Sequence, residues 1–156
     1  GLLMRAFKTS AVQLPADLDA QIETALARRA LDRLGLENRA GHLLWGADRI
    51  GDALTAGRVR LLLHAADAAP DGVAKLESRR RAAPRAVAVV RLPADRAQLS
   101  MALGRENVVH AAVCDAAASA RVATAVERWR AYAGTSDESA ATETPVAGQK
   151  GIKVRK

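Results

Sequence analysis

Apolar residues along the chain alternate between stretches with helical spacing and short unbroken runs. Between Asp17 and Ala40 they recur at helical intervals, which predicts a helix that Gly41 ends. Apolar runs of strand length follow at 58–65, 85–92 and 108–114. Because apolar residues are consecutive in these runs, we expect strands that are buried on both faces.

Helical spacing returns between and after these runs, at 48–56, 67–81, 96–103 and 116–133. Asp67 and Asp95 are suitable N-caps for two of these helices, and Gly134 would end the last. Helices that alternate with short apolar strands are typical of α/β proteins. The pattern therefore predicts a three-layer α-β-α sandwich around a small mixed sheet of about four strands.

Two segments differ from this predicted core. Residues 1–15 end at Pro15, and we interpret them as an extended lead-in. Residues 135–156 contain Ser, Thr, Gly, Glu and Lys but almost no large apolar side chains, which predicts a disordered tail with an acidic half and a basic end. The folded domain is expected to span residues 16–134.

Composition narrows the class of protein further. Alanine accounts for 36 of the 156 residues, and because alanine favours helices this argues against an all-β fold. The single cysteine, Cys114, excludes an intrachain disulfide and a zinc site built from several cysteines. We find neither a membrane-spanning run nor a secretory signal, so we expect a cytoplasmic protein.

Positive charge is the strongest compositional indication of a partner. The formal net charge is +7, and 19 of the 24 basic residues are arginine. Arginine presents a planar fork of donors that fits phosphate, and an excess of positive charge on a small domain favours a polyanion such as nucleic acid. A GC-rich genome also favours arginine over lysine, but it does not account for the net excess of charge.

An enzyme is a weaker hypothesis. His64 and His110 lie in or beside predicted strands and can be neighbours, and Asp67 and Cys114 complete a conceivable nucleophilic site. A thiol in an apolar strand usually packs as a small hydrophobe and stays protonated, however. No spacing typical of a metal site, a P-loop or a dinucleotide fingerprint occurs. We therefore expect no catalysis, no cofactor, no metal and no small-molecule substrate.

A glycine-rich segment is the better candidate for binding. Arg39 lies at a helix end, Gly41 and Gly46 flank a short apolar piece at 42–45, and a new helix begins just beyond. Glycine permits close approach of a phosphate backbone, and free N–H groups at a helix start attract anions. The same glycines are equally explained as a helix C-cap and a turn.

The segment LGLENRAGHLLWGADRIGDALTAGRVRLLLHAADAAPDGVAKL resembles the first half of the kink-turn-binding ribosomal protein superfamily, and of its bacterial YlxQ-type branch in particular. The matching positions are Ala40, Gly41, His42, Leu43, Gly46, Ala65, Asp67, Ala68 and Ala69. The later segment ALGRENVVHAAVCD resembles the second half of the family. The resemblance covers roughly residues 30–126. MRAFKTSAVQLPADL at the N-terminus is similar to the end of a YlxR-type domain, as in fusions of the two domains.

This resemblance implies RNA binding by an α-β-α sandwich, through a Gly-rich helix start and the loop before the last strand. Carried over by position, the RNA-binding residues are Arg39, Gly41, Gly46, Ala47, Asp48, Arg49, Arg105, Glu106, Asn107, Val108 and Val109. Val108 and Val109 would pack against an exposed base or, alternatively, belong to the strand core. The run Arg79–Arg81, with Arg85, would extend the basic surface or simply complement a helix dipole.

The chain departs from the family pattern at the residues that read kink-turns. Family members have Asn-Glu after the glycine and a lysine soon after, whereas this chain has Asp48, Arg49 and Asp52. We therefore expect looser selectivity for structured or bulged RNA, in a monomeric protein linked to transcription termination or translation. A protein-interaction module on the same fold is the alternative, and the RNA-positioning domain of a methyltransferase is a third hypothesis.

Overall fold

The computed structural model describes residues 16–141, with side chains from 17 to 134. The elements are, in chain order, α2 (Ala16–Arg39), β1 (Leu43–Trp45), α3 (Ala47–Thr55), β2 (Leu61–His64), α4 (Pro70–Arg81), β3 (Ala88–Arg91), α5 (Arg96–Leu103), β4 (His110–Val113) and α6 (Ala116–Ala141). None of these described helices is both long and apolar enough to cross a lipid bilayer. The predicted lead-in, residues 1–15, lies outside the described residues.

The four strands form one mixed sheet in the order β1-β4-β2-β3. β4 runs antiparallel to β1 and to β2, and β2 runs parallel to β3. Because of these directions, β1, β2 and β3 all finish at the end of the sheet where β4 begins. We call this the entry end of the sheet, and the pairs Trp45↔Ala111 and His64↔His110 mark it.

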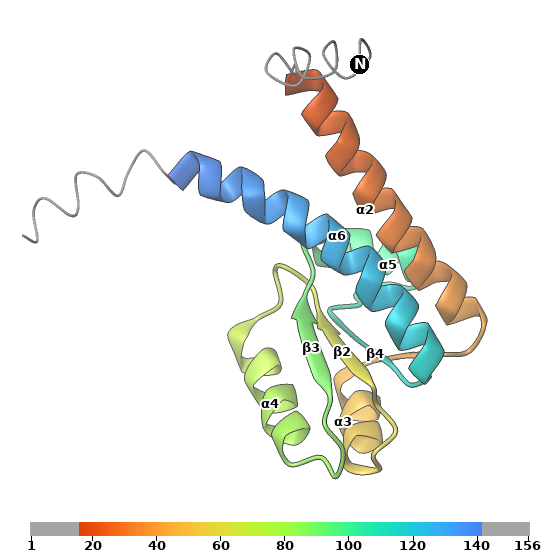
Figure 1. Cartoon of the computed structure of the whole chain (residues 1–156). Helices are drawn as coiled ribbons and strands as arrows, with labels where there is room; N and C mark the ends of the chain where they lie inside the picture. The colour runs from red at the N-terminus through yellow and green to blue at the C-terminus, as the bar shows by residue number, and fades with distance from the viewer. Residues whose placement is uncertain (1–15, 142–156) are drawn as a thin grey trace, which may run out of the picture.

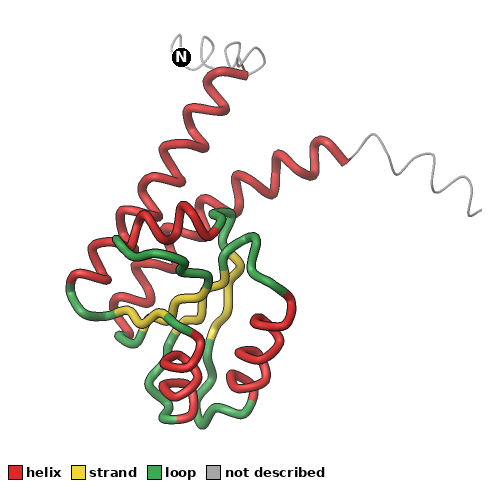
Figure 2. Tube along the Cα trace, turned by 180° about the vertical axis from the view of Figure 1, so that it is seen from behind, coloured by secondary structure: helices red, strands yellow, loops and turns green. Residues whose placement is uncertain are grey.

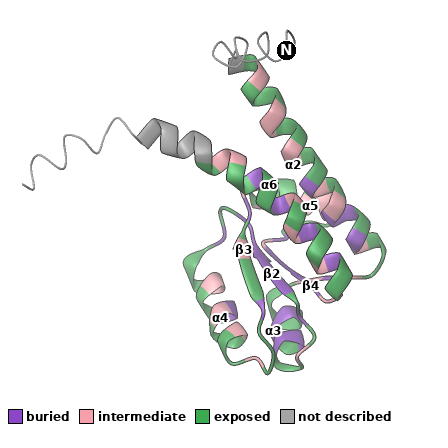
Figure 3. Ribbon diagram, in the orientation of Figure 1, coloured by how far each residue is buried: buried purple, intermediate pink, exposed green. Residues whose placement is uncertain are grey.

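Helices cover both faces of this sheet, as the sequence predicted (Figures 1 and 2). The side chains of β2 alternate between the two faces, since successive residues of a strand point to opposite sides. Leu61 and Leu63 pack in the core below α2, α5 and α6, whereas Leu62 packs in the core below α3 and α4. Burial is concentrated in this central strand and its neighbour β4 (Figure 3). The three-layer sandwich is therefore confirmed.

A buried carboxylate joins the two long helices of the upper layer. Glu37 of α2 is 2% exposed and accepts hydrogen bonds from Arg121 Nε of α6 at 2.5 Å and from His42 Nδ1 at 2.8 Å. Arg33, one turn earlier on α2, adds a longer contact at 3.4 Å. The hydrogen bond from Arg121 and the partners beside it lower the pKa of Glu37 from 4.5 to about 2. Glu37 thus stays ionised and fixes the end of α2 against α6.

The strand predicted at 85–92 is not buried on both faces. It forms β3, residues Ala88–Arg91, at the edge of the sheet, and Val89 is 37% exposed. Apolar sequence alone does not distinguish a central strand from an edge strand, because strand order is a property of the whole sheet. The short apolar piece at 42–45, for which the sequence predicts no particular secondary structure, contains β1 and completes the four strands of the sheet.

The prediction that Asp67 caps the helix after β2 is wrong. α4 begins at Pro70, with Ala69 as its N-cap. Proline suits the first helical position because its missing N–H and its fixed φ cost nothing there. Asp67 instead accepts a hydrogen bond from the backbone N–H of Arg96 at 2.9 Å. The carboxylate therefore binds the first N–H of α5, a helix that follows much later in the chain and has Asp95 as its N-cap.

The last helix does not end at Gly134 as predicted. α6 continues through this glycine to Ala141, and Gly134 does not take the positive φ of a C-cap. A glycine inside a helix costs only about 1 kcal/mol relative to alanine, which continued helical hydrogen bonding offsets. The rest of the predicted tail, 142–156, lies outside the described residues.

Candidate nucleic-acid interface

A hollow of about 400 Å³ lies at the entry end of the sheet. Its lining residues are Gly46, Ala47, Ala69, Arg96, Asn107, Val109 and His110. They come from the start of α3, the loop after β2, the start of α5 and the loop into β4. These segments are far apart in sequence, and the strand directions bring them together because each lies at the same end of the sheet.

The start of α3 presents open backbone to solvent beside this hollow. Gly46 is the N-cap of α3 with φ +96°, and no side chain caps the helix. Apart from its two neighbours in the chain, no described residue has an atom within 4 Å of the place where a Cβ on Gly46 would stand. The first turn of a helix has N–H groups without intrahelical partners, and these attract anions. A phosphate can therefore approach this helix start closely, and a side chain at position 46 would obstruct it.

Trp45 holds two arginines beside the hollow. The guanidinium carbon of Arg105 lies 4.7 Å from the centre of the Trp45 ring, and that of Arg49 lies 5.7 Å from it. Arg49 belongs to the first turns of α3, and Arg105 belongs to the loop before β4. Cation–π attraction restricts both long side chains, so less conformational entropy is lost when they bind a ligand. The tryptophan thus connects the two segments that the sequence analysis had singled out separately.

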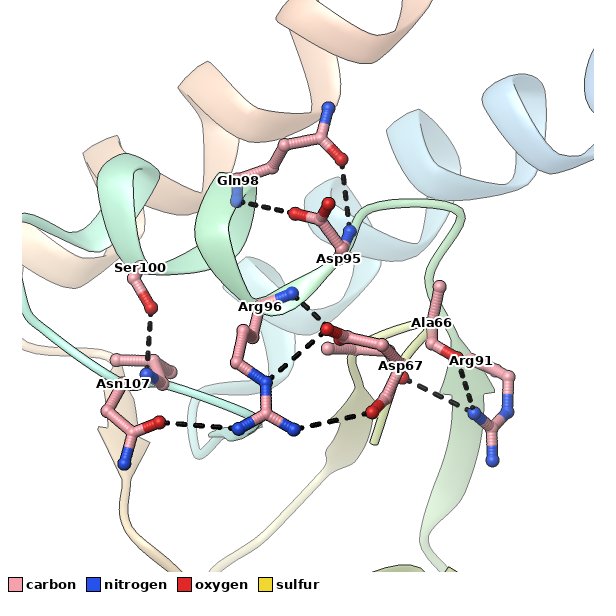
Figure 4. Close-up of polar contacts among 10 residues, drawn as sticks. Ala66, Asp67, Arg91, Asp95, Arg96, Gln98, Ser100 and Asn107 are labelled. Atoms are coloured by element: carbon pink, nitrogen blue, oxygen red, sulfur yellow. Dashed lines mark hydrogen bonds and ion pairs between the residues drawn. The ribbon is translucent and has the colours of Figure 1, made fainter. Parts of the chain in front are cut away.

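Arg96 lines the hollow and fixes the loop after β2 (Figure 4). Its Nε donates to Asp67 Oδ2 at 3.3 Å, and its Nη2 donates to the Asp67 carbonyl at 3.4 Å. Although burial acts in the opposite direction, the hydrogen bonds from Arg96 lower the pKa of Asp67 below its usual value. On the other side of the loop, Arg91 Nη1 donates to the Ala66 carbonyl at 2.9 Å. This loop is therefore held by two arginines from β3 and α5.

The loop before β4 has one residue in an unusual backbone conformation. Asn107 has φ +59°, in the left-handed region that asparagine tolerates better than most residues. Its Oδ1 accepts from Arg96 Nη1 at 3.5 Å, and the next N–H, that of Val108, donates to Ser100 Oγ at 2.8 Å. Figure 4 shows both hydrogen bonds as dashed lines. Val108 is buried in the core, whereas Val109 is half-buried, packs against the edge of the same core and lines the hollow. The core interpretation is therefore confirmed for Val108, and base packing by Val109 stays a prediction.

The structure brings together most of the residues carried over from the resemblance. Gly46, Ala47, Asn107 and Val109 line the hollow, and Arg49 and Arg105 stack on Trp45, the residue before Gly46. Asp48 and Glu106 are exposed in the same two segments without lining the hollow. Arg39 and Gly41 do not line it either. Arg39 lines a separate groove between α2 and α5, where its Nη1 lies 3.7 Å from the Cβ position of Gly35.

Sequence reasoning missed four residues of this site: Trp45, Ala69, Arg96 and His110. Trp45 offered a signal, because an aromatic residue directly before a glycine and a helix start suits a binding surface. Arg96 offered no signal in the sequence, because it acts by binding Asp67 and Asn107, and only the folded chain places these two residues beside it.

The two histidines predicted to be neighbours are neighbours. His64 Nδ1 and His110 Nδ1 lie 2.8 Å apart, so one donates to the other. Burial lowers the pKa of His64, and it lowers that of His110 to about 4. Both rings are therefore neutral near neutral pH. The described residues contain no group of three or more side chains that could hold a metal ion.

Cys114 does not join the histidines, because it follows the opposite end of β4 and packs against the core below α3 and α4. Burial raises the pKa of its thiol, which keeps it protonated. We expect Cys114→Ala to lower the free energy of unfolding by about 1 kcal/mol, the loss typical of a small packing change. Urea unfolding would measure this, and RNA affinity should be unchanged. If a folded Cys114→Ala variant lost RNA binding, the thiol would have a function beyond packing, which would contradict this prediction.

The basic run at the end of α4 is largely used inside the molecule. Arg79 Nη2 donates to Thr55 Oγ1 at 2.9 Å, and the guanidinium lies 2.9 Å from the Cβ position of Gly51 on α3. Arg80 Nη1 donates to the Val87 carbonyl at 2.8 Å. These two arginines hold α4 against its neighbours, although the Arg79 side chain remains 47% exposed. Arg81 and Arg85 remain exposed.

Comparison with known proteins finds relatives only among solved structures. No protein-family model matches the chain, and no curated protein matches it. A protein of unknown function from Bacillus halodurans is 30% identical, with a TM-score of 0.56, over 64% of this chain and 97% of that one. A 15.5 kD RNA-binding protein of Giardia lamblia is 21% identical, with a TM-score of 0.54, over 69% of this chain and 90% of that one. The second likeness establishes a shared fold, which agrees with the fold that the family resemblance implied.

Proposed function

We propose that this chain, which belongs to one family with the Bacillus halodurans protein, is a non-enzymatic RNA-binding protein. The observation that carries the proposal is the pair Arg49 and Arg105, held on Trp45 beside the open helix start at Gly46. The fold shared with the Giardia RNA-binding protein supports the same function. So does the resemblance to the kink-turn-binding superfamily, including its YlxQ-type branch.

In this proposal the two guanidiniums and the N–H groups of α3 bind consecutive parts of one RNA backbone. Guanidiniums bind phosphate with two parallel hydrogen bonds, and helix N–H groups bind it without any side chain in the way. Val109 and the hollow next to it receive an unstacked base, which bulged or looped RNA provides and a continuous duplex does not. The partner is therefore structured RNA with a bulge or loop, which we place in transcription or translation.

Selectivity for kink-turns is not part of this proposal. Asp48 is exposed in the first turn of α3, where its carboxylate repels phosphates. Asp52 lies 3.8 Å from Arg79 Nη2, on the side of α3 that faces α4. Neither residue supplies the amide or the ammonium that the family pattern places there. A kink-turn RNA should bind no more tightly than an ordinary bulged hairpin of equal length.

Tryptophan fluorescence provides a direct test, because the chain has only Trp45 and Trp129. Trp129 is 3% exposed in the core, whereas Trp45 is partly exposed beside the hollow. We expect a bulged hairpin RNA to quench the Trp45 emission, since a base or a phosphate changes the surroundings of the ring. A titration with Trp129→Phe isolates this signal, and a fully paired duplex of equal length serves as the control.

Two outcomes would overturn the proposal. Fluorescence of Trp129→Phe that is unchanged while RNA binds would place the RNA elsewhere on the molecule. If this protein bound the bulged hairpin RNA no more tightly than a neutral protein of the same size does, the protein-interaction alternative would be the better explanation.

A further inference from the structure

A second basic surface lies in the outer helical layer, away from the hollow. α2 and α6 pack against each other (Figure 1). Residues of both helices line a groove of about 770 Å³. Its charged lining residues are Arg28, Arg29, Asp32 and Arg33 of α2, with Arg121 and Arg128 of α6. None of them lines the hollow at the entry end of the sheet.

The charge in this groove is strongly unbalanced, since five of its lining residues are arginines and one is an aspartate. Arg33 and Arg121 are engaged by the buried Glu37. Within the part of the chain that the structure describes, Arg28, Arg29 and Arg128 form no ion pair and are exposed. Their guanidiniums are therefore free to bind an anionic ligand.

The arginines follow both walls of the groove. On α2 they recur within two turns of helix, and on α6 Arg121 and Arg128 are seven positions apart, which corresponds to about 10 Å along the axis. One small anion does not reach both ends of such a row. The arrangement instead suits an extended chain of negative charges.

The uncharged residues that line the groove indicate which chain fits it. They are Ala25, Ala120, Ala125 and Thr124, with Leu36 as the one large apolar residue. Protein interfaces draw most of their affinity from large aromatic or apolar anchors, and this groove presents one such side chain. Arginine contacts to phosphates need no such anchor and are set by the position of the backbone. The groove therefore fits a nucleic-acid backbone better than an acidic peptide.

We propose that the groove between α2 and α6 binds a second segment of the same RNA, through phosphate contacts from Arg28, Arg29 and Arg128. This inference rests on the proposed function, because the hollow selects the bulge and the groove then holds the flanking stem. An RNA that reaches both surfaces should bind more tightly and with a steeper salt dependence than one that reaches only the hollow.

The test compares two probes on the full chain: a short bulged hairpin, and the same hairpin with its stem extended several-fold. The variant is Arg28→Glu with Arg128→Glu, which leaves the Glu37 network intact. The matched control is Arg81→Glu with Arg85→Glu, which changes the net charge equally on the opposite layer. We expect the groove variant to lose about tenfold in affinity for the long hairpin, and its salt slope to fall by roughly 0.7–0.9 for each lost contact. Its affinity for the short hairpin should change by less than about twofold, and the control should change neither affinity to a comparable extent.

Equal losses for the groove variant and the control would overturn the inference, because they would reflect net charge alone. The inference would also be overturned if polyglutamate displaced the long hairpin from the groove while the short hairpin stayed bound. That result would show that the groove suits an acidic protein. If the short hairpin binds and the long one gains nothing, the groove fails and the proposed function stands. If neither hairpin binds, both fail.

Discussion

Replacing Arg49 and Arg105 together with glutamate should weaken the binding of a bulged hairpin RNA about a hundredfold or more. Hydrogen bonds to charged groups contribute roughly 1.5–3 kcal/mol each, so two lost contacts account for that factor before any repulsion is added. The reversed charges add repulsion at the place where Trp45 now holds two guanidiniums. No larger effect on binding is expected from any other pair in the described chain.

Titration at several salt concentrations would measure this loss. The slope of log affinity against log salt should fall by roughly 0.7–0.9 for each arginine, because fewer counterions are released from the RNA. Arg49→Lys with Arg105→Lys is the matched control. Lysine keeps the charge but not the planar fork, so the slope should persist while affinity falls moderately. A glutamate variant with the wild-type slope would show that these side chains do not meet phosphate.

Glu37→Gln should clearly lower the stability of the fold. The substitution keeps the size of the side chain but removes the charge that accepts hydrogen bonds from Arg121, Arg33 and His42. We expect the free energy of unfolding to fall by about 2 kcal/mol. A greater loss is not expected, because the side chain of Arg121 is 45% exposed and can turn its charge to water. Urea unfolding near neutral pH would measure the difference.

The same carboxylate should make stability depend on pH in a defined direction. The pKa of Glu37 is depressed in the folded protein, from 4.5 to about 2, so the unfolded chain binds its proton first as the pH falls. The contribution of Glu37 is fully present above about pH 5 and is lost between these two pKa values as the solution becomes more acidic. The Gln variant should lose less stability than the wild type across that interval.

Glu127→Gln is the matched control for both measurements, because Glu127 forms an exposed ion pair with Arg130 at 3.1 Å. Exposed pairs of this kind contribute about 0–1 kcal/mol, so this variant should resemble the wild type. A Glu37→Gln variant as stable as the control, or one with the wild-type acid dependence, would show that the buried network does not fix α2 to α6.

Local pattern determined the order of elements in this protein. The spacing of apolar residues is a property of each segment, and it located the helix over residues 17–40, the central strands β2 and β4, and the N-cap at Asp95. Asp95 and Gln98 form a reciprocal capping pair, which depends only on residues three positions apart. Such features are readable from sequence because their causes lie within a few residues of each other.

The resemblance identified two separate segments of the site, and the strand directions explain why they meet. Gly46 and Asn107 line one hollow because β4 runs antiparallel to β1, so the end of one strand meets the start of the other. Neither segment, taken alone, indicates that the two residues lie close together. Trp45, the residue that bridges them through Arg49 and Arg105, was missed for the same reason.

The remaining differences arise where a residue's role depends on distant parts of the chain. Asp67 is followed by a helix, yet it binds the first N–H of α5 because Pro70 starts α4 later and the chain after β3 brings Arg96 alongside. β3 has the apolar sequence of a buried strand, yet it lies at the edge because the order of strands leaves it with one neighbour. Sequence alone determined most of the helices and strands, with β1 and the end of α6 as the exceptions, because hydrophobic spacing and capping act locally. Only the tertiary structure decided which residues share a surface, because strand order and direction follow from packing the whole chain.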